Sequence, residues 1–526
     1  MTEVAVPLGR RRPEGAGPAG SPTRPAPAAP GAPVPAAPAP GAPVPADPGA
    51  GSGAAHHRPE LLPLDAGEHY RFGFDMNSCI GCHSCEVACA EQNGLPAGTV
   101  WRRVGEIEGG DHPRTRRFHL SMSCNHCLDP ACLNGCPTNA YEKLDTGIVA
   151  HHADDCIGCQ YCTWTCPYSV PAFQPDRRIV TKCDMCRPRL DEGYLPACVD
   201  ACPTHAITVE KVRVDDWIAD HSAADAPELP SSDLTLSTTR IELPRDVPVE
   251  TFAASDWNVR PEDPHWPLVW LTLVSQVALG VSLTQVAGGS AGGRALAAAL
   301  ATAGMVGALG HLGRPVMAWK ALRNLRRSWL SREVALLSLY AALAVGAVLV
   351  PALAPVAAVA GVAGVVASAC LYIVPGRPAW DTPLTIVRFL ATALALGPPL
   401  TGHVALGAAG GLVAVAATAA NWARLARRPD HAWRGAVRLE LRWFAPATVI
   451  RLAATAVGVG AGLAGGPPAL VVAALALGEG LGRWLFFVTV VPLNMPGSFF
   501  RGTTHLASLT ARWRGERRQN HTGGRH

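Results

Sequence analysis

The residues most able to do chemistry in this 526-residue chain are its cysteines, because sixteen of the seventeen lie between Cys79 and Cys202. Two runs, at 79–89 and 156–166, share the spacing C-x2-C-x2-C-x3-C. In bacterial ferredoxins three cysteines of such a run wrap one [4Fe-4S] cluster, and the fourth binds the neighbouring cluster. Two looser sets each end before a proline: Cys124, Cys127, Cys132, Cys136 and Cys183, Cys186, Cys198, Cys202. Sixteen thiolates are enough for four [4Fe-4S] clusters, so we expect electron-transfer chemistry.

Two other chemistries use paired cysteines. Disulfides are expected in small secreted domains with an even number of cysteines, but they need no repeated C-x-x-C pattern. The N-terminal "GRRRPEG" is followed by no apolar segment of the kind that a secretory signal contains, which favours a reducing compartment. Zinc sites also use C-x-x-C pairs, yet they require neither the further cysteines of this pattern nor the following proline. We therefore favour iron–sulfur clusters over both.

The second half of the chain, which must position this cysteine region, has a very different composition from it. Eight apolar stretches follow from Trp266, each of roughly 20 residues, which is long enough to cross a bilayer as a helix. They lie at about 266–287, 293–311, 333–353, 355–375, 383–402, 404–423, 444–465 and 468–491. Their alanine and glycine content suits close helix packing in lipid. Helices buried in a soluble bundle are the alternative, but eight in series would leave almost no polar surface.

Composition divides the chain into five segments. Residues 1–55 are rich in proline, alanine and glycine, and we expect a disordered tail without chemistry. A cysteine-rich domain spans 70–214, and a polar linker that contains "ADHSAADAPELPSSD" spans 215–264. The membrane domain spans 265–500, and a basic cytoplasmic tail spans 501–526.

The basic residues of the membrane half predict its orientation. Two loops on one side carry most of them: Arg314, Lys320, Arg323, Arg326, Arg327 and Arg332, and then Arg424, Arg427, Arg428, Arg434, Arg438 and Arg442. The opposite loops are nearly free of them, with Arg294 the main exception. The positive-inside rule places both termini and the cysteine domain in the cytoplasm, with the spans in the inner membrane. A net charge of only +4, without a basic stripe interleaved with aromatic residues, excludes a nucleic-acid partner.

The order of the cysteine sets resembles the four-cluster electron-transfer subunit of the molybdopterin oxidoreductases, the group that includes dimethyl sulfoxide reductase, nitrate reductase and formate dehydrogenase. The resemblance covers residues 72–210 and lies in "CIGCHSCEVACAEQNGLP", "WRRVGE", "CNHCLDPACLNGCPTNAY", "CIGCQYCTWTCPY" and "KCDMCRPRLDEGYLPACVDACPTHAI". It implies an α+β ferredoxin-like domain with two bicluster ferredoxin modules, fused here to an all-α polytopic membrane domain of eight transmembrane helices.

The same resemblance implies interleaved ligand sets for four clusters. Cluster 1 would be held by Cys79, Cys82, Cys85 and Cys202, and cluster 2 by Cys183, Cys186, Cys198 and Cys89. Cluster 3 would be held by Cys124, Cys127, Cys132 and Cys166, and cluster 4 by Cys156, Cys159, Cys162 and Cys136.

The membrane half resembles the eight-helix anchor of dimethyl sulfoxide reductase, most specifically in "HLGRPVMAWKALRNLRRSWLSRE", and also in "HWPLVWLTLVSQVALG", "GRPAWDTPLT" and "GRWLFFVTVVPLNMPGSFF". That anchor oxidises menaquinol without a haem, and its quinol-site histidine and glutamate match His311 and Glu333. A histidine and a carboxylate suit the proton release of quinol oxidation, and the spans lack paired histidines for a haem. A structural role stays open for His311, as does a packing pair for Arg451 and Glu479. The two subunits are separate polypeptides in the family, whereas here they are fused.

The resemblance therefore implies an electron-transfer and membrane-anchor subunit that connects the quinone pool to a separate molybdopterin-containing catalytic subunit in anaerobic respiration. Two alternatives stay open. The same path can run in reverse, from a formate or sulfur-compound dehydrogenase to quinone, or the clusters can be mainly structural in an assembly platform. Trp101, Arg102 and Arg103 either contact a partner or pack beside a cluster.

Overall fold

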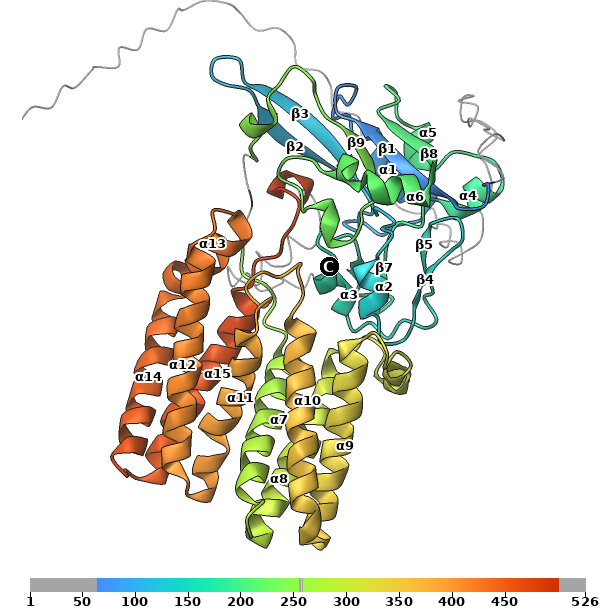
Figure 1. Cartoon of the computed structure of the whole chain (residues 1–526). Helices are drawn as coiled ribbons and strands as arrows, with labels where there is room; N and C mark the ends of the chain where they lie inside the picture. Colours follow the sequence, from blue (N-terminus) through green and yellow to red (C-terminus); the bar gives the residue numbers. More distant parts are fainter. Residues whose placement is uncertain (1–63, 255–256, 258, 501–526) are drawn as a thin grey trace, which may run out of the picture. The chain divides into compact units, whose positions relative to one another are not determined.

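The computed structural model describes residues 64–254, 257 and 259–500, so the expected tails at 1–55 and 501–526 lie outside the described residues. The described chain forms a cysteine-rich α+β domain followed by long apolar helices (Figure 1). This architecture confirms the fold class predicted from the sequence.

A three-stranded sheet in the order β8, β1, β9 is the largest sheet of the described cysteine-rich domain. Strand β1 (Glu68–Asp75) pairs antiparallel with β8 (Ile207–Arg213), so the beginning of the cysteine-rich sequence lies beside its end. Strand β9 (Arg240–Glu242) pairs in parallel with the other edge of β1. The cysteine sets are therefore enclosed between two strands that close the domain.

Three two-stranded antiparallel hairpins complete the described β-structure. They are β2 (Arg103–Gly109) with β3 (Arg116–Met122), β4 (Tyr141–Lys143) with β5 (Val149–His151), and β6 (Ala172–Gln174) with β7 (Ile179–Thr181). Short helices carry or follow the cysteines: α1 (Ser84–Gln92), α2 (Ala131–Gly135), α3 (Tyr161–Thr165), α4 (Arg187–Asp191) and α5 (Ala197–Asp200). Because most of these elements are short, loops bearing cysteines fill much of the interior.

The two ferredoxin-type runs have the same backbone conformation. Gly81 and Gly158 both have a φ of 68°, and two residues later His83 and Gln160 both have a φ of 61°. Glycine adopts this left-handed conformation without strain, and a Cβ at Gly158 would lie 2.3 Å from the Arg178 carbonyl oxygen. Both runs therefore turn sharply between their first two cysteines, as the repeated spacing predicts.

The stretch at 215–264, predicted as a linker, is folded into the cysteine-rich domain over much of its length. Helix α6 (Val214–Ala219) buries Trp217, whose indole N–H donates to the Ser237 carbonyl at 2.9 Å. Strand β9 lies in the same stretch and extends the main sheet. The structure differs from the prediction here because one buried aromatic ring and backbone pairing outweigh the polar composition.

Eight helices of the described chain are long and apolar enough to cross a membrane, which confirms the predicted number. They are α7 (Trp266–Thr284), α8 (Ala291–Ala308), α9 (Trp329–Leu349), α10 (Ala354–Tyr372), α11 (Leu384–Leu396), α12 (Val404–Ala426), α14 (Ala445–Leu463) and α15 (Pro468–Val488). Three of the spans are extended by 3-10 turns, to His311 after α8, back to Pro351 before α10, and to Thr401 after α11. The third span begins at Trp329 rather than at 333, because the Ser328 hydroxyl caps the helix by accepting from the Ser331 amide.

Small residues let these helices approach closely. A Cβ at Gly280 of α7 would lie 2.0 Å from the Ala393 carbonyl oxygen of α11, and one at Gly397 would lie 2.4 Å from the Gly280 backbone. Neither glycine can be replaced without moving a helix backbone. The alanine and glycine content noted in the sequence is therefore used at helix contacts, as expected in lipid.

The chain returns to the cysteine-rich domain after its last span. The 3-10 helix η10 (Gly497–Phe500) lies beside β2, where the Ser498 hydroxyl accepts from the Glu106 amide at 2.9 Å. Phe499 is 2% exposed and belongs to the same buried apolar cluster as the β1 side chains. A Cβ at Gly105 would lie 2.0 Å from the Phe499 ring, so this glycine makes room for it. We call the segment 495–500 the C-terminal clasp.

Candidate metal centres and membrane site

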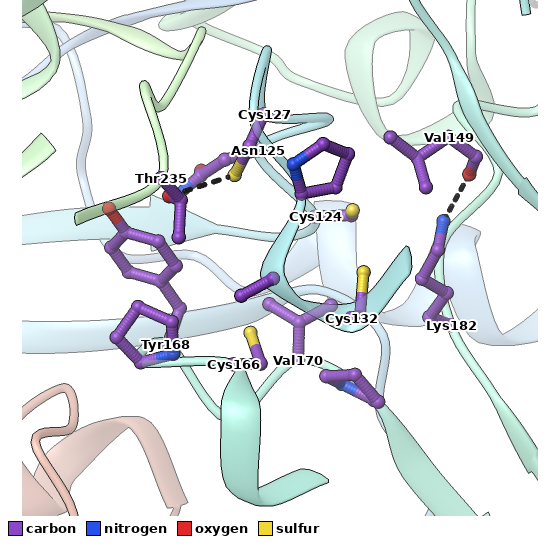
Figure 2. Close-up of a pocket in the computed structure, with 14 residues that line it drawn as sticks. Cys124, Asn125, Cys127, Cys132, Val149, Cys166, Tyr168, Val170, Lys182 and Thr235 are labelled. Carbon is purple, nitrogen blue, oxygen red and sulfur yellow. Dashed lines mark hydrogen bonds between the residues drawn. The ribbon is translucent and has the colours of Figure 1, made fainter. Parts of the chain in front are cut away.

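Four cysteines from two separate sequence sets line one cavity. They are Cys124, Cys127, Cys132 and Cys166, whose sulfur atoms surround a common space in Figure 2. The Thr235 hydroxyl donates to the Cys127 sulfur at 3.1 Å, and the His126 amide donates to the Cys124 sulfur at 3.5 Å. Donors aimed at sulfur are typical of protein-bound iron–sulfur clusters.

Cys79, Cys82, Cys85 and Cys202 line a second cavity. The Cys85 sulfur lies 3.3 Å from the Ser121 hydroxyl. Cys82 is exposed, and the adjoining Ile80 is 62% exposed. This group of four therefore lies close to the protein surface.

Each of the remaining eight cysteines belongs to one of two further predicted sets, and members of each set lie near one another. Burial, with the nearby Cys198 and Cys186, raises the pKa of Cys89 to about 12. Cys183 has Cys89 and Cys198 among its charged neighbours. In the other group burial, with the nearby Cys136 and Cys156, raises the pKa of Cys159 to about 12. Cys162 has all three of these residues among its charged neighbours.

This arrangement fits iron–sulfur clusters. In the described residues no three histidine, cysteine or acidic side chains are close enough to hold a single metal ion, because the sulfurs stand around cavities instead. A buried thiol with a raised pKa stays protonated at neutral pH, whereas a coordinating thiol loses its proton to the metal. The donors suit a multi-iron cluster in each space.

The proposed cluster 4 loops rest directly on the membrane domain. The Gly313 and Arg314 amides donate to the carbonyls of Gly158 and Ile157, at 3.4 and 3.0 Å. From the start of α9 and the turn before it, polar side chains donate to the backbone around Cys136: Asn324 to Cys136 at 2.8 Å, Ser328 to Gly135 at 2.7 Å, and Ser331 to Pro137 at 3.3 Å. These bonds fix the loops against the second and third spans.

Several basic residues of the same loop have a contact role that the topology argument did not predict. Lys320 and Arg323 form ion pairs with Asp155, next to Cys156, at 3.0 and 2.7 Å. Arg314 donates to the Ala153 carbonyl at 3.0 Å. The pairing with Lys320 and Arg323 lowers the pKa of Asp155.

His311 and Glu333 lie on either side of this contact. His311 ends the turn η5 (Leu309–His311), two residues before Gly313, and is half-buried. Glu333 in α9 is 4% exposed, and one of its carboxylate oxygens has no hydrogen-bond partner. No hydrogen bond or ion pair joins the two side chains in the described structure. Instead, each adjoins the loops of the proposed cluster 4.

Tyr161 connects Glu333 to the cysteines. It lies between Cys159 and Cys162 in the sequence, and its hydroxyl donates to the Leu371 carbonyl of α10 at 2.8 Å. Burial and the nearby Glu333 and Cys159 raise the pKa of Tyr161. The carboxylate therefore lies within electrostatic reach of the loop that carries the cysteines.

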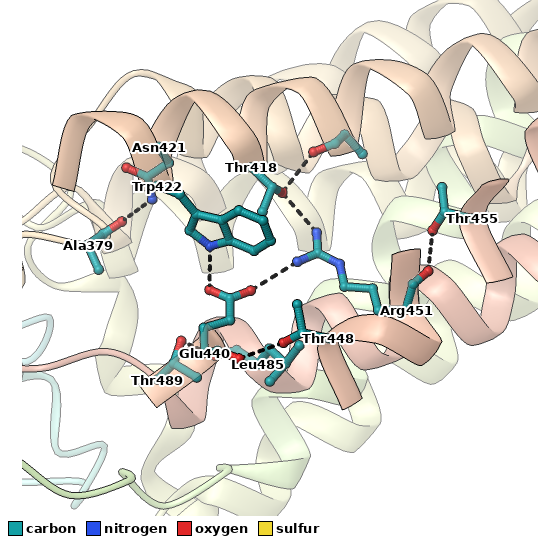
Figure 3. A network of polar contacts seen from close by, with 11 residues as sticks. Ala379, Thr418, Asn421, Trp422, Glu440, Thr448, Arg451, Thr455, Leu485 and Thr489 are labelled. Atoms are coloured by element: carbon teal, nitrogen blue, oxygen red, sulfur yellow. Dashed lines mark hydrogen bonds and ion pairs between the residues drawn. The ribbon is translucent and has the colours of Figure 1, made fainter. Parts of the chain in front are cut away.

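The other membrane charges form a separate network (Figure 3). Arg451 pairs with Glu440 at 3.2 Å and donates to the Thr418 hydroxyl at 2.8 Å, while the Trp422 indole N–H donates to Glu440 at 2.9 Å. Glu479 does not pair with Arg451, and it accepts from Thr392 at 2.6 Å. Arg451 thus has a packing role, with a different partner from the one considered in the sequence analysis.

Some residues around the cysteines were missed by the sequence analysis. Lys182 and Thr235, which both line the first cavity, are two of them. Arg102 was named there, and of its two expected roles the structure shows packing beside the cysteines: it is buried near Cys85 and Cys198, and its guanidinium donates to Ser121 and Ser123. Lys182 had a local signal, because it directly precedes Cys183 in "TKCDMC". Thr235 had none, because it comes from the stretch expected to be a linker.

These observations define a class: a ferredoxin-type electron-transfer domain joined to a multi-pass membrane domain. The chain matches the family model described as a 4Fe-4S dicluster domain over residues 115–212, and that of the DMSO reductase anchor subunit over residues 263–411. The chain belongs to the dimethyl sulfoxide reductase iron–sulfur and anchor subunit family, as a fusion of the two subunits.

Curated relatives match the cysteine-rich part. An anaerobic dimethyl sulfoxide reductase chain of Haemophilus influenzae is 38% identical over 177 residues, which are 32% of this chain and 86% of the relative. The probable anaerobic dimethyl sulfoxide reductase chain YnfG of Escherichia coli K12 is 41% identical over 155 residues, 27% of this chain and 76% of the relative. A sulfite dehydrogenase subunit of Allochromatium vinosum is 38% identical over 154 residues, 25% of this chain and 64% of the relative.

Proposed function

We propose that this chain oxidises menaquinol beside His311 and Glu333 and relays the electrons through four [4Fe-4S] clusters to a separate molybdopterin-containing catalytic subunit in anaerobic respiration. The observation that carries the proposal is the contact between the membrane loops and the cluster 4 cysteines. The residues at 313–314 and 324–331 bind the backbone around Cys156 and Cys136, and the same segments are flanked by His311 and Glu333.

The cysteines would hold the clusters in the four interleaved sets expected from the family. Two of these sets are the cysteines that line the two cavities, and the other two are the groups of mutually interacting thiols. When bound, the clusters supply one-electron relays between the membrane and the partner. The burial of most of the sulfurs keeps water away from this path.

The membrane residues would handle protons. Oxidation of one quinol releases two electrons and two protons, so the site needs acceptors for both. Glu333 has a free carboxylate oxygen in a buried position, and His311 is an imidazole at the end of its span. A carboxylate and an imidazole are suitable general bases. An ionisable residue inside a membrane is costly and is by default a functional candidate.

The exit of electrons would lie at cluster 1. The cavity lined by Cys79, Cys82, Cys85 and Cys202 is near the surface, where Ile80 and Val87 are exposed apolar side chains. A partner that docks there would cover this apolar surface and approach the cluster closely. The domain would lie on the cytoplasmic side of the inner membrane, because it contacts the basic loop at 312–328 and the positive-inside rule places that loop in the cytoplasm.

Metal analysis of the gently solubilised complex, purified anaerobically from native membranes, tests the proposal. Four clusters predict sixteen irons per chain and little zinc, with molybdenum or tungsten from the partner. Iron without molybdenum or tungsten would contradict the proposed partner. Zinc in place of iron would overturn the cluster assignment.

The reverse direction is a second candidate, in which the partner is a dehydrogenase and quinone is the acceptor. The sulfite dehydrogenase subunit among the relatives favours it, because its name describes oxidation of a sulfur compound. Reduction of the clusters by a menaquinol analogue, in membranes without any partner substrate, supports the forward direction. Reduction by sulfite but not by menaquinol would support the reverse.

A further inference from the structure

A buried lysine lies between two of the cysteine groups. Lys182 is 3% exposed and lines the cavity of the cluster 3 cysteines (Figure 2). Its ammonium group donates to the Val149 carbonyl and, at 2.9 Å, to the carbonyl of Cys183, which belongs to the cluster 2 group. Cys124 and Cys132 of the cluster 3 group line the same cavity as Lys182, and Cys183 directly follows it in the sequence. The ammonium charge therefore faces two cysteine groups at once.

His126 makes a second connection across the same junction. It lies between Cys124 and Cys127 in the sequence and is 0% exposed. Its Nδ1 accepts from the Val149 amide at 3.1 Å, so Nε2 carries the proton and points at the Cys183 sulfur, 3.9 Å away. Burial and the nearby Lys182 lower the pKa of His126, which keeps the ring neutral.

The other cations near the cysteines have different cysteine neighbours from those of Lys182. Lys143 donates to the carbonyls of His126 and Cys127, both at 2.8 Å, and its cysteine neighbours all belong to the cluster 3 group. On the membrane side, the cluster 4 group has tyrosines and backbone amides around it, with Arg314 as the cation near Cys156. Arg102 is a buried cation with neighbours in the cluster 1 and cluster 2 groups, Cys85 and Cys198 among them. Lys182 is thus the described lysine whose cysteine neighbours belong to both the cluster 2 and the cluster 3 groups.

A fixed positive charge changes the reduction equilibrium of a cluster. A [4Fe-4S] cluster gains one negative charge when it accepts one electron, so a cation in a low-dielectric interior stabilises the reduced form. Hydrogen bonds to the cluster sulfurs act in the same direction. The electron leaves one cluster and enters the next, and no proton transfer is required at the junction.

Resting on the cluster assignment of the proposed function, we propose that Lys182 raises the reduction potentials of clusters 2 and 3 together, and that His126 links them. Lys182 is a positioning residue, and its charge makes clusters 2 and 3 hold electrons more strongly than they would without it. Electrons that arrive from cluster 4 are drawn away from the membrane, which opposes their return to quinone.

Redox titration followed by electron paramagnetic resonance tests this proposal in membranes that contain the full chain with its partner. Lys182→Met removes the charge, and Lys182→Gln removes it but keeps a hydrogen-bond donor. We expect the reduction equilibrium constants of two of the four clusters to fall by at least tenfold. For one electron, this corresponds to a fall of about 59 mV in each midpoint potential. Lys182→Arg keeps the charge and is expected to keep both potentials near those of the wild type.

Two matched variants sharpen the result. Lys143→Met removes a charge beside the cluster 3 group only, so one potential is expected to fall rather than two. Lys211→Met removes a lysine of β8 that lines neither cavity, and all four potentials are expected to stay unchanged.

The outcomes separate this inference from the proposed function. Wild-type membranes without four iron–sulfur signals would defeat the proposed function whatever the variants do. Four signals and sixteen irons per chain, with unchanged potentials in Lys182→Met and Lys182→Gln, would defeat only the role of Lys182. Loss of iron from both neutral variants would assign Lys182 to cluster assembly and would also overturn the proposal.

Discussion

The two four-helix halves of the membrane domain differ in the partners of their buried carboxylates. In the first half, α7 to α10, the buried carboxylate is Glu333, and its neighbours are Tyr161 and Tyr372. In the second half, α11 to α15, Glu440 pairs with Arg451, and Glu479 accepts from Thr392 and lies near arginines. A buried acid that has an arginine partner fixes the packing of helices. One that lacks such a partner stays available for proton exchange.

Removing one member of the Arg451 pair is expected to have the largest effect on stability. Arg451→Met leaves Glu440 buried without its cation, which costs about 3–5 kcal/mol. A thermal melt of the solubilised complex measures the loss as a lower Tm. The double variant Glu440→Gln with Arg451→Met removes both charges and should recover much of it. If the double variant melts no higher than the single one, the pair is not the reason for the loss.

Glu333→Gln is expected to act on turnover rather than on stability. If Glu333 accepts a proton from quinol, the variant lowers quinol-dependent cluster reduction by about 100-fold, while the Tm stays the same. Glu479→Gln is the matched control, because it changes a second buried membrane carboxylate, one that lies near Arg388 and Arg483. Stopped-flow reduction with a menaquinol analogue gives both rates. Equal rates for the two variants would contradict the distinction between the halves.

Gly482→Ala tests the packing around Arg451 more gently. A Cβ at this position would lie 2.8 Å from the Arg451 Nε and 3.0 Å from its Cζ, so the guanidinium must move. Overpacking of this kind costs about 1–3 kcal/mol. Gly460→Ala, where a Cβ meets nothing within 4 Å, should cause no loss. Equal melting temperatures for the two alanine variants would contradict the expected overpacking at Gly482.

Asp155→Asn is expected to have the smallest effect, because the ion pairs with Lys320 and Arg323 are partly exposed. Such pairs contribute at most about 1 kcal/mol each. The pairing lowers the pKa of Asp155, so its contribution is complete above the ordinary carboxylate value and is lost only as the pH falls through the lowered one. The difference in Tm between wild type and variant should therefore be constant from pH 6 to 8 and should shrink in high salt.

The membrane half was largely predictable because its signal is local. A run of apolar residues specifies a span wherever it occurs, so all eight spans were found, with ends displaced by a few residues. The start of α9 was placed four residues late because the helix begins at Trp329, directly after the Ser328 cap, and its first turn contains the polar residues Ser331 and Arg332. The cysteine groups followed from the family's cysteine pattern rather than from the residues alone.

The features that were missed depend on contacts between distant parts of the chain. The strand β9 exists because it meets β1, and a three-residue strand in a polar stretch has no periodicity of its own. The contact role of Lys320 and Arg323 depends on Asp155, which lies more than 160 residues away in the sequence. Basic residues near a span were explained by topology, and nothing in the sequence distinguished those that also bind the cysteine domain.

The C-terminal clasp has a consequence for the covalent connection between the two parts of the chain. The cysteine-rich domain is held by the segment that precedes α7, by the polar contacts before α9, and again by Phe499 and Ser498 beyond α15. If the chain were cut just before α7, the membrane fragment would therefore still carry the residues before α9 and beyond α15 that contact the cysteine-rich domain. The fusion raises the local concentration of the cysteine-rich domain and the membrane domain, which already have complementary surfaces. The two domains should therefore also assemble when they are expressed as separate polypeptides.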